Sequence, residues 1–160
     1  MVCKFTELET MDQLSEAISL LQNQQFANAE IAFNNLLESG DTKIHQHLAE
    51  SQLHQQMFTE AIDTLQKGLN ITPEKPELLV YLSQVLWGTG QKEKAIPPHE
   101  KAVQLIPSDM QLMSNMASMY YEMNRKDDAI EIFEKMLLNS PDAFQIHFNI
   151  GSIHLEETRY

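Results

Sequence analysis

Small residues recur along this chain at a nearly constant interval, and this repetition constrains the fold more than any other feature. One column of small side chains consists of Ala17, Ala49, Ser83, Ala117 and Gly151. A second column consists of Ala29, Ala61, Ala95 and Ala129. In both columns the first step is 32 residues long and every later step is 34. A period of this length predicts short helical units stacked in a row.

Two further columns follow the same period. One contains only prolines, namely Pro73, Pro107 and Pro141, and the other contains Phe26, Phe58, Lys92, Lys126 and Tyr160. Because both small-residue columns have the same short first step, we place a two-residue deletion between Ala29 and Ala49, in the loop 38–42.

Each period has the pattern of a helix, a short turn, a second helix and a loop. The stretches "KIHQHLAESQLHQQ" and "FTEAIDTLQKGLNITP" form one such unit. The proline ends the second helix because it lacks the N–H group that would continue the helix, and it pushes the residue before it out of the helical region. The small residues allow the two helices of one unit to cross at close range.

This arrangement resembles the tetratricopeptide repeat (TPR) family over about residues 10–160. The resemblance implies an all-α fold, a right-handed superhelical solenoid of antiparallel helix pairs with about nine helices. We expect a single domain over residues 1–160. Its repeats are predicted at 10–41, 42–75, 76–109 and 110–143, and residues 144–160 are predicted to form a half repeat or a capping helix.

Pro97 and Pro98 stand side by side in the second helix of the third repeat. Repeat alignment starts that helix near Glu93, and a proline beyond the first turn costs roughly 3 kcal/mol. We therefore expect the helix either to begin late, near Pro97 or Pro98, or to kink there. The pair is interpreted as a shortened first turn or as a hinge.

The charge balance excludes several classes of partner. The chain has 11 Lys and Arg residues against 23 Asp and Glu residues, for a formal net charge of -12. Such a surface repels phosphate backbones and anionic lipid, so we expect neither nucleic acid nor membrane as a partner, and a protein or peptide of neutral or basic character instead. The first residues contain no apolar segment typical of a secretory signal, and Cys3 is the single cysteine. These features predict a cytoplasmic protein.

No pattern in the sequence indicates catalysis. His47 and His54 are seven residues apart, as are His147 and His154, but a metal site needs a third or fourth ligand that the helical pattern does not supply. No carboxylate pair stands out from a solvated helix face, and no phosphate-binding loop occurs. We therefore expect no enzyme activity, no cofactor and no metal.

Four methionines, Met113, Met116, Met119 and Met123, lie at steps of three, three and four along one predicted helix. They are interpreted either as core packing between stacked repeats or as an adaptable binding surface, because the thioether side chain is flexible.

The TPR resemblance implies a concave face lined by the first helix of each repeat. Alignment with the groove positions of the family gives Lys43, Gln46, His47, Glu50, Tyr81, Gln84, Trp87, Gln111, Ser114, Asn115, Ser118, Tyr121, Gln145, Phe148, Asn149 and Ser152. From these we take as the predicted peptide-binding site Tyr81, Gln84, Trp87, Gln111, Asn115, Ser118, Tyr121, Phe148 and Asn149. The aligned asparagines can bond a peptide backbone, and the aromatic rings can supply binding hot spots. The set of basic residues that clamps a terminal carboxylate in chaperone-binding relatives is absent from these positions.

The sequence is thus interpreted as a non-enzymatic protein-interaction module or scaffold that binds a peptide segment in a concave groove. Two alternatives remain open. The chain could be the assembly or regulatory arm of a larger enzyme that continues beyond residue 160, or it could resemble the small acidic chaperones of bacterial secretion systems. Self-association is also possible.

Overall fold

The computed structural model describes residues 7–37 and 41–157, so Cys3, Tyr160 and most of the predicted deletion loop lie outside the described part of the chain. Within that part the chain forms nine α-helices and no strand, which confirms the all-α solenoid. The helices are α1 (Glu7–Gln22), α2 (Phe26–Leu36), α3 (Thr42–His54), α4 (Phe58–Ile71), α5 (Pro76–Gly88), α6 (Lys92–Leu105), α7 (Met110–Glu122), α8 (Lys126–Asn139) and α9 (Phe144–Glu157).

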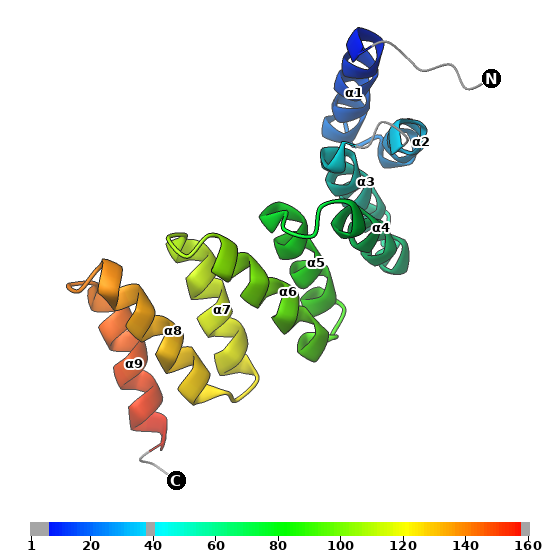
Figure 1. The fold of residues 1–160 in the computed structure, drawn as a ribbon. Helices are drawn as coiled ribbons and strands as arrows, with labels where there is room; N and C mark the ends of the chain where they lie inside the picture. Colours follow the sequence, from blue (N-terminus) through cyan, green and yellow to red (C-terminus); the bar gives the residue numbers. More distant parts are fainter. Residues whose placement is uncertain (1–6, 38–40, 158–160) are drawn as a thin grey trace.

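Each helix packs mainly on its neighbours in the sequence, and the pairs follow one another along a curved array with the two termini at opposite ends (Figure 1). First helices of neighbouring pairs also touch, α1 with α3 and α3 with α5. In these N-terminal repeats the first helices therefore approach one another more closely than the second helices do.

The same turn connects the two helices of every pair. It contains one residue with positive φ in each repeat, namely Gln24, Gln56, Gly90 and Asn124. The N–H of Met57 bonds to the carbonyl of Gln52, and the N–H of Gln56 bonds to the carbonyl of Leu53. These two bonds define a Schellman motif, which satisfies the last carbonyls of the first helix.

The repeat columns mark the helix ends. Phe26, Phe58, Lys92 and Lys126 are the first residues of α2, α4, α6 and α8. Pro73, Pro107 and Pro141 each follow the last residue of a second helix by two positions. At the start of α3 and α7, Asp41 and Asp109 accept hydrogen bonds from the backbone N–H groups of Lys43 and Leu112, both at 2.9 Å. These aspartates are N-caps.

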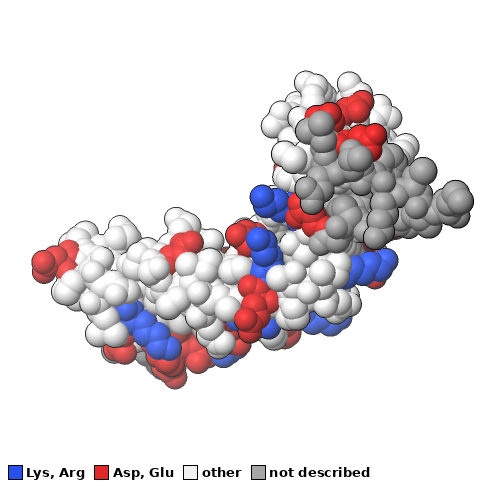
Figure 2. All heavy atoms as spheres, turned by 45° about the horizontal axis from the view of Figure 1, so that its top comes forward, with Lys and Arg blue, Asp and Glu red and all other residues white. Residues whose placement is uncertain are grey.

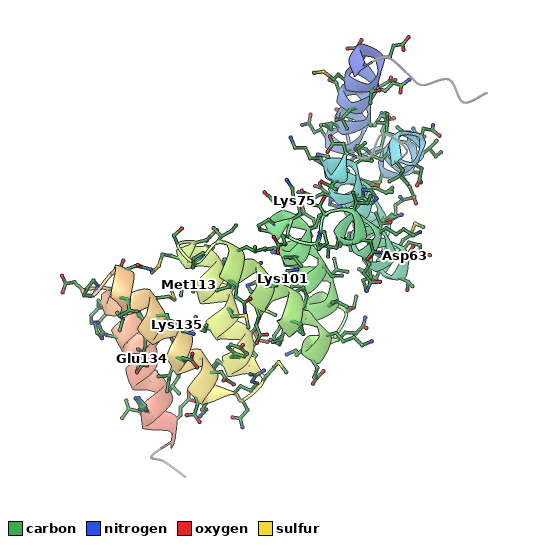
Figure 3. The ribbon with its side chains drawn as sticks, viewed as in Figure 1. Asp63, Lys75, Lys101, Met113, Glu134 and Lys135 are labelled. Carbon is green, nitrogen blue, oxygen red and sulfur yellow. The ribbon has the colours of Figure 1, made fainter. Side chains whose placement is uncertain are left out.

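In the first four repeats the small-residue columns lie at the helix crossings, whereas Gly151 of α9 is exposed. Their members up to the fourth repeat, Ala17, Ala49, Ser83 and Ala117 in the first column and Ala29, Ala61, Ala95 and Ala129 in the second, all have 0% exposure. Met113, labelled in Figure 3, is 4% exposed, and Met116 and Met119 are 1% and 8% exposed. These methionines therefore belong to the core, and the alternative of an adaptable binding surface is wrong for them.

A histidine occupies one core position of the third repeat. His99 is 1% exposed and aligns with the buried side chains of Phe33, Leu65 and Phe133. Its Nε2 lies 3.1 Å from the carbonyl oxygen of Leu112, and its Nδ1 lies 3.3 Å from the hydroxyl of Ser83. Because a carbonyl only accepts, Nε2 carries the proton. The imidazole thus has polar neighbours on α5 and α7, and the Ser83 hydroxyl itself donates to the carbonyl of Ala95 at 2.8 Å.

The expectation of a late start for the proline helix is wrong. Helix α6 begins at Lys92 and contains both Pro97 and Pro98. Neither proline can donate to the carbonyl four residues earlier, on Glu93 and Lys94, but both of those residues are exposed and water can bond these carbonyls. Burial of the opposite face, including Ala95 at 0% exposure, holds the segment in place. Tertiary packing therefore overrides the local preference.

No helix in the described ranges is long and apolar enough to span a membrane.

Candidate functional site

A hollow of about 480 Å³ lies between α7 and α9, above α8. It is lined in part by residues that the sequence placed in the groove, namely Ser118, Tyr121, Phe148, Asn149 and Ser152. Most of its lining side chains come from the first helices α7 and α9, and Phe133 comes from the second helix α8. Its volume is within the range of ligand sites, roughly 300–1,000 Å³.

The floor of the hollow is apolar. Ala117, Phe133 and Ile153 line it and are 0%, 6% and 3% exposed. The rings of Tyr121 and Phe148 also line the hollow and are 39% and 57% exposed. Two partly exposed rings beside a buried apolar floor offer contact area to a ligand at little cost in side-chain entropy.

Ion pairs connect successive repeats at one edge of the hollow. The Nζ of Lys92 lies 3.1 Å from an oxygen of Glu122, which lines the hollow. One repeat later, the Nζ of Lys126 lies 3.1 Å from an oxygen of Glu156. Both carboxylates therefore have a lysine partner. Exposed pairs of this kind contribute only about 0–1 kcal/mol to stability, so their main effect here is on local charge.

Glu156 also accepts a hydrogen bond from the hydroxyl of Tyr121, whose oxygen lies 2.7 Å from Oε1 and 2.9 Å from Oε2. This hydrogen bond stabilises protonated tyrosine and ionised glutamate. It therefore raises the pKa of Tyr121 and lowers the pKa of Glu156.

The two predicted asparagines have the same local geometry. Gln111 donates through Nε2 to Oδ1 of Asn115 at 3.0 Å, and Gln145 donates to Oδ1 of Asn149 at 3.1 Å. Each glutamine lies one turn before its asparagine on the same helix. In both cases the amide oxygen is engaged and the NH₂ group remains as the donor.

The other predicted site residues lie outside the hollow. Trp87 on α5 is partly buried, and the Nζ of Lys92 lies 4.7 Å from the centre of its ring. Tyr81 faces Gln46 and Glu50 of α3, and its pKa is raised, first by burial and then by the charge of Glu50. Gln84 is exposed on α5. The structure thus brings Ser118, Tyr121, Phe148 and Asn149 to the hollow, while Gln111 and Asn115 of α7 and the three predicted residues of α5 lie outside it.

Sequence reasoning missed the charged partners at the hollow. Glu122 and Glu156 are 34 residues apart, as are Lys92 and Lys126. Their common period could have indicated a repeated ion pair at the junction of successive repeats. The predicted groove columns omitted all of them because those columns came from the resemblance alone.

Charged side chains are distributed unevenly on the face that Figure 2 shows. Figure 2 shows a largely uncharged surface over the C-terminal helices on the left, with acidic and basic side chains gathered in the middle and along the lower edge. Several charged residues labelled in Figure 3, including Asp63 of α4, Lys101 of α6 and Lys135 of α8, come from second helices. In the described ranges no group of three His, Cys, Asp or Glu side chains is arranged to hold a metal ion.

The helix pairs, their Schellman turns and the small-residue crossings define a TPR-type solenoid. The family model of ChAPs, described as Chs5p-Arf1p-binding proteins, matches residues 10–147, and the chain belongs to this family. No curated protein sequence matches the chain significantly.

Solved structures share the fold at low sequence identity. MamA from Desulfovibrio magneticus RS-1 is 16% identical with a TM-score of 0.75, over 93% of this chain and 85% of that one. YrrB, described as a TPR protein with an unusual peptide-binding site, is 20% identical with a TM-score of 0.73, over 91% and 76%. A tetratricopeptide repeat protein from Parabacteroides merdae ATCC 43184 is 13% identical with a TM-score of 0.81, over 94% and 61%.

Proposed function

We propose that the chain is a non-enzymatic protein-interaction module and that its inner face, centred on α7 and α9, binds an extended peptide segment. The observation that carries this proposal is the hollow at Ser118, Tyr121, Phe148 and Asn149, where residues from two repeats converge on an apolar floor. Gln111, Asn115 and the α5 residues Tyr81, Gln84 and Trp87 extend the same face toward the N-terminus.

The asparagines suit an extended backbone as a ligand. Asn115 and Asn149 each keep an NH₂ donor, and the two donors are separated by one repeat. A peptide carbonyl accepts such a donor whatever its side chain is, so these bonds supply affinity and register. The apolar hollow beside them can supply selectivity.

The comparisons support protein as the class of ligand. The description of the ChAPs family names binding of Chs5p and Arf1p, and the description of YrrB names a peptide-binding site. The net charge of -12 favours a partner that is neutral or basic and disfavours nucleic acid and anionic membranes. We place this interaction in the cytoplasm.

The test is selection from a library of random 12-residue peptides displayed on phage, followed by affinity measurement on the purified chain. The double variant Asn115→Ala, Asn149→Ala should bind the selected peptides at least tenfold more weakly. The matched control, Asn70→Ala with Asn139→Ala, changes two exposed asparagines on the second helices α4 and α8 and should bind like the wild type. Equal binding by all three proteins would contradict the proposal.

A further inference from the structure

We propose that the α7/α9 hollow is a pocket for one uncharged, aromatic side chain of the bound segment, flanked by backbone carbonyls that accept from Asn149 and Asn115. This inference rests on the proposed peptide-binding function and names the chemistry of the residue that anchors the peptide. It therefore narrows the ligand from a neutral or basic segment to one with a tryptophan, phenylalanine or tyrosine at a defined position.

The floor of the hollow is suited to an apolar side chain of the ligand. The floor is made of a methyl group, a benzyl ring and a branched aliphatic chain, from Ala117, Phe133 and Ile153. None of these side chains carries a hydrogen-bonding atom, so a polar group that reached the floor would lose its water without a replacement. Because Tyr121 and Phe148 also line the hollow, an inserted ring would contact aromatic surface as well as the floor.

The charged residues at the rim of the hollow favour an uncharged side chain of the ligand. Glu122 is the one charged residue among the hollow's described lining residues, and the Nζ of Lys92 lies 3.1 Å from it. Glu156, which holds the hydroxyl of Tyr121, is paired with Lys126 at the same distance. A lysine or arginine of a ligand would compete with one of these internal cations for its carboxylate, and an acidic residue would meet two carboxylates. The rim therefore disfavours either sign of charge.

The uncharged polar groups at the rim of the hollow suit the peptide backbone beside the inserted side chain. Ser118 already donates through its hydroxyl to the carbonyl of Ser114 at 3.0 Å. The amide of Asn149 offers its NH₂ group, since its oxygen accepts from Gln145. A donor beside an apolar pocket fits the backbone carbonyl next to an inserted side chain. The same donor on Asn115, one repeat away, fixes the direction in which the segment leaves the pocket.

The pocket is tested with blocked pentapeptides of sequence Gly-Ser-X-Ser-Gly, in which X is Trp, Lys or Glu. Amide chemical shifts of the ¹⁵N-labelled chain are followed during titration with each probe. The Trp peptide should shift the amides of Ser118, Phe148 and Ser152 in a saturable way, and the Lys and Glu peptides should not. Equal shifts by all three probes, or Trp-dependent shifts confined to other helices, would overturn the inference.

Variants in which a larger side chain fills the pocket provide a second test of the inference. Ser152→Leu adds an apolar side chain at the lining of the hollow from α9, and Ser118→Leu does so from α7. Each should weaken the Trp probe and the phage-selected peptides at least tenfold, whereas Gln104→Leu, at an exposed position of α6, should not. If the filled variants bind selected peptides normally while Asn115→Ala, Asn149→Ala does not, the pocket inference fails and the proposed function stands. If no peptide depends on those asparagines, the proposed function fails as well.

Discussion

The hydroxyl of Tyr121 on α7 donates to the carboxylate of Glu156 on α9, at 2.7 Å from Oε1 and 2.9 Å from Oε2. The two residues belong to successive repeats, so this bond spans a repeat junction beside the proposed peptide pocket. It also orients the Tyr121 ring against the hollow.

This relationship predicts a measurable change in the titration of Tyr121. Its pKa is raised, first because the neutral hydroxyl donates to Glu156 and then by desolvation and by the negative charge. Glu156→Gln removes the charge and weakens the acceptor, so the Tyr121 pKa should fall toward its ordinary value. Tyrosine ring resonances followed by NMR from neutral to alkaline pH measure this directly. An unchanged Tyr121 pKa in the variant would show that the bond is not formed in solution.

Two glycines predict opposite effects on stability. A Cβ on Gly68 of α4 would lie 2.9 Å from Cβ of His45 and 2.9 Å from Cδ1 of Leu78, whereas a Cβ on Gly151 of α9 meets nothing within 4 Å. Gly68→Ala should therefore lower the free energy of unfolding by about 1–3 kcal/mol through overpacking. Gly151→Ala should raise it by up to about 1 kcal/mol, because alanine is the better helix former. Urea denaturation of both variants gives the two values, and a stabilised Gly68→Ala would contradict the packing.

The proline pair lies in the interior of α6, so its replacement should stabilise the protein. The aligned residues of the other repeats are Asp63 and Glu131 at the position of Pro97, and Thr64 and Ile132 at that of Pro98. The double variant Pro97→Glu, Pro98→Ile supplies the N–H donors for the carbonyls of Glu93 and Lys94. We expect the free energy of unfolding to rise by about 1 kcal/mol or more. An unchanged or lower melting temperature would mean that the fold requires the prolines.

His99 predicts a loss of stability in mild acid. Burial lowers its pKa below the ordinary value of 6.5, against a smaller raising effect of the Leu112 carbonyl. As the pH falls below about 6.5, the unfolded chain takes up a proton at His99 before the folded chain does, so the free energy of unfolding decreases. His99→Phe places at this position the residue that Phe33 and Phe133 supply in other repeats, and it removes this contribution. Its stability should fall less steeply between pH 7 and pH 5 than that of the wild type in urea denaturation, and parallel curves would exclude the effect.

The period alone predicted most of the fold, because each repeat carries its own start, stop and crossing residues. Lys92 and Lys126 begin their helices where the column places them, and Pro107 follows the end of α6. The late start expected at the proline pair is wrong because local propensity does not include the burial of Ala95 and His99 on the opposite face. The positive φ of Gln24 and Gln56 could not be predicted either, since glutamine has no special preference for that conformation.

The site was less accessible from the sequence than the fold. The groove columns placed Ser118, Tyr121, Phe148 and Asn149 on one face, and the structure brings them to one hollow. The sequence did not indicate that this hollow lies between α7 and α9. Its apolar floor includes Phe133, which belongs to the second helix α8 and is absent from any column of first-helix residues. The sequence also did not indicate that Glu122 and Glu156 at the rim are paired with lysines of neighbouring repeats.

Peptide binding on the inner face at α7 and α9 can be observed directly by NMR. The ¹⁵N-labelled chain is titrated with a phage-selected 12-residue peptide while backbone amide shifts are recorded. We expect the largest changes within residues 111–122 and 145–153, with smaller changes around Tyr81, Gln84 and Trp87. Changes confined to the second helices α4, α6 and α8, with α7 and α9 unaffected, would contradict it.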